Sequence, residues 1–144
     1  RQDPEAFDIL TRVQVPFQFQ DREWDLRWTS PVISLDAAGR LREIRYHGAL
    51  TAPVNMAFDD VPAYYRAVQA FTRLLRDPAF EIRLRMKAGD MICFHNRRVL
   101  HGRAAFDPQS GKRKLQGCYV DCDDAWSRLR VLQRGSDWDV RTHG

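Results

Sequence analysis

The sequence predicts a β-rich α+β domain with two or three helices, in which an antiparallel barrel or jelly roll is favoured over alternating βαβ units. Apolar and polar residues alternate with a period of two over much of residues 80–121, as expected for strands with one wet face. Turn residues separate these runs. Helical patterns flank the strand-like runs without alternating with them, which is typical of antiparallel sheets with added helices.

The first third of the chain predicts a helix, a strand and a hairpin. In "DPEAFDIL", Asp3 can cap a helix, Pro4 suits its first position, and Phe7 and Leu10 would share a face. The alternation in "VPFQFQ" predicts a short strand. The stretch "SPVISLDAAGRLREIRYHG" predicts a hairpin that turns at residues 36–39.

The clearest helix covers residues 60–76, "DVPAYYRAVQAFTRLLR". A capping aspartate begins it, and the Asp-Pro pair that follows it ends it. Its apolar stripe is formed by Val61, Tyr64, Val68, Phe71 and Leu75. The pair Tyr64 and Tyr65, of which Tyr64 belongs to this stripe, is expected to lie half in the core and half at the surface. Trp24 and Trp28, upstream, carry no further signal and are assigned to the core.

The second half predicts a meander of three strands, "FEIRLRM", "MICFHNRRVLHG" and "RKLQGCYVD", with tight turns between them. A last helix follows in "AWSRLRVLQR", with Trp126, Leu129 and Leu132 facing inward. We find no internal repeat and no linker. Residues 1–134 are therefore assigned to one domain portion and residues 135–144 to a tail.

The composition indicates a folded, cytoplasmic chain without a membrane segment. Its 144 residues are 44% hydrophobic, and no apolar run approaches the roughly 18–20 residues that cross a bilayer. No leader pattern precedes the domain. The net charge of +4 permits a nucleic-acid partner, but basic residues alternate with apolar ones in "FEIRLRMKAGD". A solvated strand face is the better interpretation, and we expect no nucleic-acid partner.

Three cysteines, Cys93, Cys118 and Cys122, do not predict a disulfide framework, because they are odd in number and form no Cys-x-x-Cys pair. A zinc site built from them with His95 would follow no known zinc-finger spacing. Small buried side chains are the favoured interpretation, in a reducing setting.

The stretch "HNRRVLHGRAAFDPQSGKRKLQGCYVD" leaves two interpretations open. It is either a solvated basic hairpin or a small-molecule site. In a hairpin that turns between Phe106 and Lys112, His101 and Arg113 would lie side by side, as a metal ligand and a bidentate carboxylate clamp. Tyr119 lies an even number of residues beyond Arg113, so on a regular strand it would point to the same side.

At this point the residues resemble a family. The elements "NRRVLHGR", "RKLQGCY" and "SRLRVL" stand in the order and spacing seen in the C-terminal part of the gamma-butyrobetaine and trimethyllysine dioxygenase group. This group belongs to the taurine dioxygenase-like oxygenases, which depend on Fe(II) and 2-oxoglutarate. Weaker similarity extends back to "DPEAFDILTR". The resemblance implies part of a double-stranded β-helix with flanking helices, a homodimer, and iron held by two histidines and a carboxylate.

The resemblance also implies roles for single residues. His101 corresponds to the distal histidine ligand of Fe(II), and Arg113 to the arginine that binds the far carboxylate of 2-oxoglutarate. Tyr119 corresponds to a wall of the aromatic cage for the substrate's trimethylammonium group. The implied reaction hydroxylates a small betaine-like substrate with O2, while 2-oxoglutarate is converted to succinate and CO2.

Two departures limit the resemblance. The His-x-Asp motif that supplies the other iron ligands is absent from the sequence, so we expect those ligands upstream and expect this chain alone to be inactive. In "IRYHG", His47 and Gly48 stand where the group carries paired asparagines, one of which helps to hold the substrate carboxylate. The resemblance therefore makes His47 a further substrate-binding candidate. A taurine-type oxygenase of another small substrate and a non-catalytic barrel that binds a small acid remain as alternatives.

Overall fold

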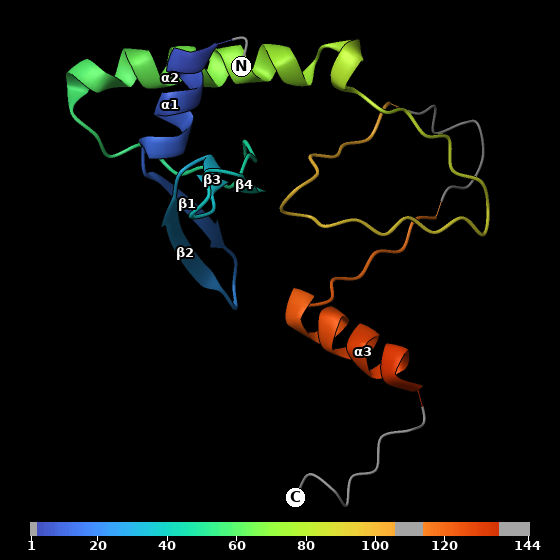
Figure 1. The fold of residues 1–144 in the computed structure, drawn as a ribbon. Helices are drawn as coiled ribbons and strands as arrows, with labels where there is room; N and C mark the ends of the chain where they lie inside the picture. The colour runs from blue at the N-terminus through green and yellow to red at the C-terminus, as the bar shows by residue number, and fades with distance from the viewer. Residues whose placement is uncertain (1–2, 106–113, 136–144) are drawn as a thin grey trace, which may run out of the picture. The chain divides into compact units, whose positions relative to one another are not determined.

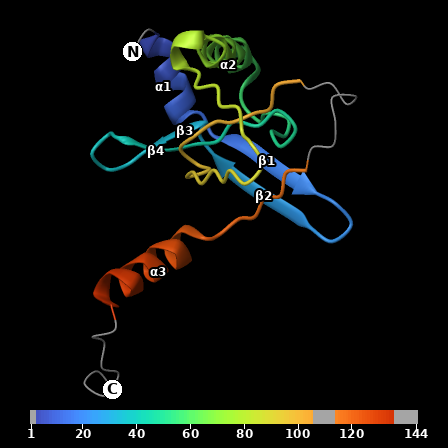
Figure 2. The same ribbon diagram turned by 90° about the vertical axis from the view of Figure 1, so that its right-hand side faces the viewer.

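A computed structural model describes residues 3–105 and 114–135, and the chain divides into two compact units, Arg1–Arg103 and Ala104–Gly144 (Figure 1). The first unit contains two antiparallel two-stranded sheets and two α-helices. Its α1 and α2 lie together at one end, and both sheets lie beyond α1 (Figure 2). A third α-helix belongs to the second unit. In the residues described, none of the helices is both long and apolar enough to span a membrane.

Helix α1 (Pro4–Arg12) begins as the sequence predicts, because the Asp3 carboxylate accepts a hydrogen bond from the Ala6 N–H at 2.9 Å. The buried residues of the helix are Ala6 and Leu10, which lie one turn apart on the face toward α2. Phe7, which the sequence places on one face with Leu10, is 46% exposed, whereas Leu10 is 2% exposed. Phe7 lies about 100° around the helix from Ala6, outside that contact.

Strands β1 (Val15–Gln20) and β2 (Asp25–Ser30) form the first sheet. Val15 pairs with Ser30 at the buried end of this hairpin, and Phe17 pairs with Trp28. Opposite residues share a face, so the apolar face continues outward beyond the part that the core covers. Trp28 is 60% exposed there and Trp24 is also exposed, so their assignment to the core was wrong.

Strands β3 (Ile33–Leu35) and β4 (Leu41–Ile44) form the predicted hairpin. The Asp36 carboxylate accepts hydrogen bonds from the N–H groups of Ala38 and Arg40, both at 2.9 Å, and pairs with the Arg40 guanidinium. Gly39 has a φ of 72°, the left-handed conformation that glycine adopts without a steric penalty. The turn is therefore fixed by its own residues.

Helix α2 (Val61–Leu75) follows the short 3-10 turn η1 (Phe58–Asp60) and packs against α1. Of the predicted apolar stripe, only Tyr64 is fully buried, since the deepest positions are taken by the small residues Ala67 and Ala70. Tyr65 is 49% exposed, which confirms the expected division of the tyrosine pair. The core of the first unit comprises Ala6, Leu10, Val15, Val32, Ile33, Tyr64, Ala67 and Ala70.

After the 3-10 turn η2 (Pro78–Phe80), residues 81–105 and 114–121 contain no strand, so the predicted three-stranded meander is wrong for the described residues. Its "KAGD" turn does form, with the Lys87 N–H bonded to the Asp90 carboxylate at 2.7 Å. A strand needs a partner ladder for its N–H and C=O groups, and alternation alone does not supply one. The described residues therefore contain fewer strands than predicted, and the double-stranded β-helix remains a prediction.

Helix α3 (Cys122–Arg134) confirms the predicted last helix, which ends at Gly135 with a φ of 69°. Its apolar residues Trp126, Leu129 and Leu132 are exposed, so their expected inward orientation is not found. No residue of α3 is buried, because no described residue of the second unit covers its apolar face. The three cysteines are exposed, so the expectation that they are small buried side chains was wrong.

Candidate functional site

His101 ends a short loop that begins at Phe94. Within it, the carbonyl of His95 accepts hydrogen bonds from the N–H groups of Arg98 and Val99, at 2.9 and 3.2 Å, and its Nδ1 accepts one from the Arg97 N–H at 3.3 Å. The rings of Phe94 and His101 lie 4.7 Å apart, at 56° to each other. His101 itself is exposed. Its imidazole is therefore accessible to a ligand and rests on one aromatic ring.

Strand β4 holds the tip of this loop. The Ile44 N–H donates to the Arg97 carbonyl at 2.7 Å, and Nη1 of Arg98 donates to the Leu41 carbonyl at 2.6 Å. The Arg97 guanidinium also lies 3.6 Å from the Glu43 carboxylate. The segment that carries His101 is thus attached to a paired strand, although it forms no strand itself.

His47 lies just beyond β4 and is exposed. Its carbonyl accepts hydrogen bonds from the N–H groups of Leu50 and Thr51 at 3.1 Å, so its backbone nucleates a turn. The Thr51 hydroxyl donates to the same carbonyl at 3.0 Å. The backbone of His47 is therefore held by hydrogen bonds, while its side chain lies at the surface.

The structure does not test whether Arg113 and Tyr119 share a pocket with His101. Arg113 lies outside the described residues. Tyr119 is 88% exposed and belongs to the second unit. Residues 114–121 form no strand, so the alternation that would place Tyr119 on the same side as Arg113 does not apply there. Their shared pocket stays a prediction.

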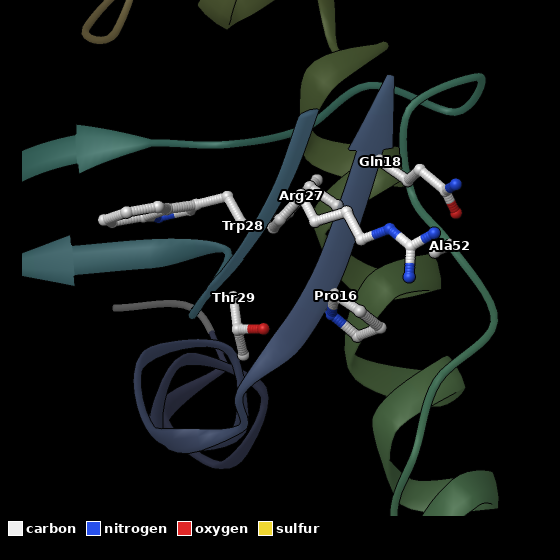
Figure 3. A pocket seen from close by; sticks show the side chains of 7 residues that line it. Pro16, Gln18, Arg27, Trp28, Thr29 and Ala52 are labelled. Carbon is white, nitrogen blue, oxygen red and sulfur yellow. The ribbon is translucent and has the colours of Figure 1, made fainter. Parts of the chain in front are cut away.

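Sequence reasoning missed a hollow over the first sheet, of about 410 Å³ (Figure 3). Pro16, Gln18, Arg27 and Thr29 line it from β1 and β2, and Ala52 lines it from the following segment. The hollow is open, and its one cationic group is already engaged. The Arg27 guanidinium contacts the Asp25 carboxylate at 2.9 and 3.0 Å and lowers the pKa of that carboxyl. We assign no ligand to it.

Trp28 points away from Gln18 and Arg27, as alternation along a strand requires (Figure 3). Its ring lies 5.4 Å from the Arg45 guanidinium, which also contacts Glu43 at 3.3 Å. Arg45 therefore joins the exposed aromatic face of β2 to the residue that pairs with Arg97. The pairing of a cation with an exposed tryptophan was detectable only from the fold.

Iron in this kind of site needs three protein ligands, and the described residues fit only one of them. No group of three or more His, Cys, Asp and Glu side chains converges in the described part of the chain. The accessible imidazole of His101 is suited to be a single ligand. These residues alone do not form a complete centre, and we derive no reaction step through it.

The sequence matches the family described as "Taurine catabolism dioxygenase TauD, TfdA family" over residues 1–119. This match includes both sheets, α1, α2 and the loop that ends at His101. The chain belongs to the TauD/TfdA family. The family resemblance inferred from the three motifs is therefore confirmed.

Several curated dioxygenases are similar to the chain in sequence. The chain is 49% identical to a gamma-butyrobetaine dioxygenase of Pseudomonas sp. (strain AK-1) over 131 residues, which are 91% of this chain and 34% of that protein. It is 34% identical to the dioxygenase str8 of Strobilurus tenacellus over 140 residues, covering 92% and 33%. It is 30% identical to a trimethyllysine dioxygenase of Meyerozyma guilliermondii over 142 residues, covering 94% and 34%. The chain spans about a third of the length of these relatives.

Proposed function

We propose that the chain is the C-terminal portion, with residues 135–144 as a tail, of a 2-oxoglutarate- and Fe(II)-dependent dioxygenase that hydroxylates a small betaine-like substrate. The observation that carries the proposal is the family match together with the 49% identity to a gamma-butyrobetaine dioxygenase. Bound iron, with 2-oxoglutarate and O2, would supply the oxidising chemistry, and succinate and CO2 would be released. A homodimer and a cytoplasmic location remain predictions.

Each proposed site residue has a chemical role that suits its side chain. The accessible His101 imidazole binds Fe(II) as one of three protein ligands, the other two being supplied by polypeptide upstream of this chain. The Arg113 guanidinium binds the far carboxylate of 2-oxoglutarate in a bidentate manner. The Tyr119 ring contacts the cationic group of the substrate, and the exposed His47 contributes to binding its carboxylate.

The proposal is tested by an anaerobic titration with Fe(II) and 2-oxoglutarate, followed by the visible charge-transfer band of the chelate. We expect the band in the parent polypeptide that includes an upstream His-x-Asp, and none in this chain alone. His101→Ala and Arg113→Ala should abolish or weaken the band, whereas His143→Gln, which alters no proposed ligand, should leave it unchanged. No band in the parent polypeptide would refute the proposal in favour of a non-catalytic barrel.

Substrate class is tested separately through Tyr119. Tyr119→Ala should raise KM for gamma-butyrobetaine by about tenfold or more, as expected for loss of a desolvated cation–π contact. Tyr119→Phe keeps the aromatic ring and should have a KM close to that of the wild type. The uncoupled turnover of 2-oxoglutarate without substrate serves as the control and should not change. An unchanged KM in Tyr119→Ala would favour a taurine-type enzyme without an aromatic cage.

A further inference from the structure

We propose that Arg98 is a positioning residue for His101, acting by fixing the loop that carries the imidazole onto β4. The proposal rests on the proposed function, because it gives the reason why that imidazole must be held. It concerns the loop from Phe94 to His101, which is defined by the hydrogen bonds within it and by its two attachments to β4.

The attachment through Arg98 joins residues 57 positions apart in the sequence. Nη1 of Arg98 donates to the Leu41 carbonyl at 2.6 Å, a short charge-assisted hydrogen bond. Leu41 begins β4 and pairs with Leu35 of β3. The acceptor is therefore fixed by the hairpin that Asp36 closes, so the Arg98 guanidinium is bonded to a strand whose turn is held by its own side chains.

A second attachment sits beside the first. The Ile44 N–H bonds to the Arg97 carbonyl at 2.7 Å, and Glu43 lies 3.6 Å from the Arg97 guanidinium. These contacts fix the neighbouring residue, Arg97, whereas the Arg98 side chain bonds to the first residue of β4. Two separated attachment points prevent the loop from pivoting about either one.

The base of the loop is closed by ring contact. The Phe94 and His101 rings lie 4.7 Å apart, within the range in which aromatic rings attract each other. His101 is otherwise exposed, and the described segment around it forms no strand. Its orientation therefore depends on the loop bringing Phe94 and His101 together. A ligand that must meet a metal at a set angle requires such support from its surroundings.

The experiment follows the imidazole protons of His101 by NMR in the 144-residue chain, with the signal assigned through His101→Gln. The Phe94 ring shifts these protons away from their values in a disordered peptide. Arg98→Met keeps most of the aliphatic stem and removes the donor, whereas Arg98→Lys keeps a cationic donor. The matched control is Arg85→Met, which removes an exposed arginine from the strandless residues before the loop. Circular dichroism verifies that every variant keeps its helices.

We expect Arg98→Met to lose most of the His101 ring-current shift and to speed hydrogen exchange of the Val99 amide about tenfold, as fits the loss of one charge-assisted hydrogen bond. Arg98→Lys should restore most of both signals, and Arg85→Met should change neither. An Arg98→Met spectrum with the His101 shift retained would overturn the proposal. Because no metal is present in this measurement, its result is independent of whether the parent polypeptide binds iron.

Discussion

Replacing Leu10 of α1 by alanine tests the placement of this helix against the core, and Phe7 of the same helix provides the comparison. Leu10 is 2% exposed, whereas Phe7 is 46% exposed. The sequence pattern alone predicts that truncating either residue lowers the free energy of unfolding by a similar amount. The structure predicts a large decrease for Leu10→Ala only.

The expected cost follows from burial. Truncating leucine to alanine removes about three buried carbon groups at roughly 0.8 kcal/mol each, and the cavity left behind adds to this. We expect Leu10→Ala to lower the free energy of unfolding by about 3 kcal/mol. For Phe7→Ala, the half-exposed ring loses about 1 kcal/mol of burial, and the better helix propensity of alanine returns about 0.5 kcal/mol.

Urea unfolding followed by far-ultraviolet circular dichroism measures both changes, provided that the dependence on urea is the same in each variant. Phe7→Ala is the matched control, since it removes a larger side chain from the same helix. A cost for Phe7→Ala equal to or above that for Leu10→Ala would refute the placement of α1 against the core.

Two further predictions concern the contacts that hold β4. Tyr46→Phe keeps the edge-on contact with the Phe71 ring but removes the 2.6 Å hydrogen bond to the Thr72 hydroxyl, so it should cost about 1 kcal/mol in urea unfolding, and an unchanged stability would contradict the bond. Hydrogen bonds from the Arg40 N–H and guanidinium lower the pKa of the Asp36 carboxyl below its ordinary 3.8. The ionised carboxylate therefore stabilises the folded state above pH 3.8, and this stabilisation is lost as the pH falls through the lower folded-state pKa. The stability difference between the wild type and Asp36→Ala should therefore be clear near neutral pH and should shrink as the pH falls below 3.8. A difference that stays constant across this range would count against the hydrogen bonds of the turn.

The elements that could be predicted from the sequence are those whose causes are local. Asp3 caps α1 with its own carboxylate, and Asp36 with Gly39 closes the β3–β4 turn within five residues. Helix α2 ends at Leu75, just before the Asp-Pro pair that predicts its end, and the Asp77 carboxylate accepts a hydrogen bond from the Ala79 N–H at the start of η2. In each case the signal and its partner lie within four positions of each other.

The features that could not be predicted depend on distant partners. Strand β2 was not predicted, because residues 25–30 form a strand by pairing with β1 and show no strand pattern of their own. The alternation after Phe80 predicted strands, but alternation carries no information about which segment would pair with them. For the site, the motif around His101 identified the residue, while the Arg98 bond to Leu41 emerges only from the fold.

The hairpin of β1 and β2 has two unlike edges. Strand β1 is bonded on both sides, to β2 and to the segment after β4, through the Gln18 N–H to the Leu50 carbonyl and the Ala52 N–H to the Pro16 carbonyl. Among the residues described, β2 pairs along one side only. An unpaired edge is a template for another strand. The free edge for an added strand is therefore β2, and residues 25–30 would set the register in which that strand pairs.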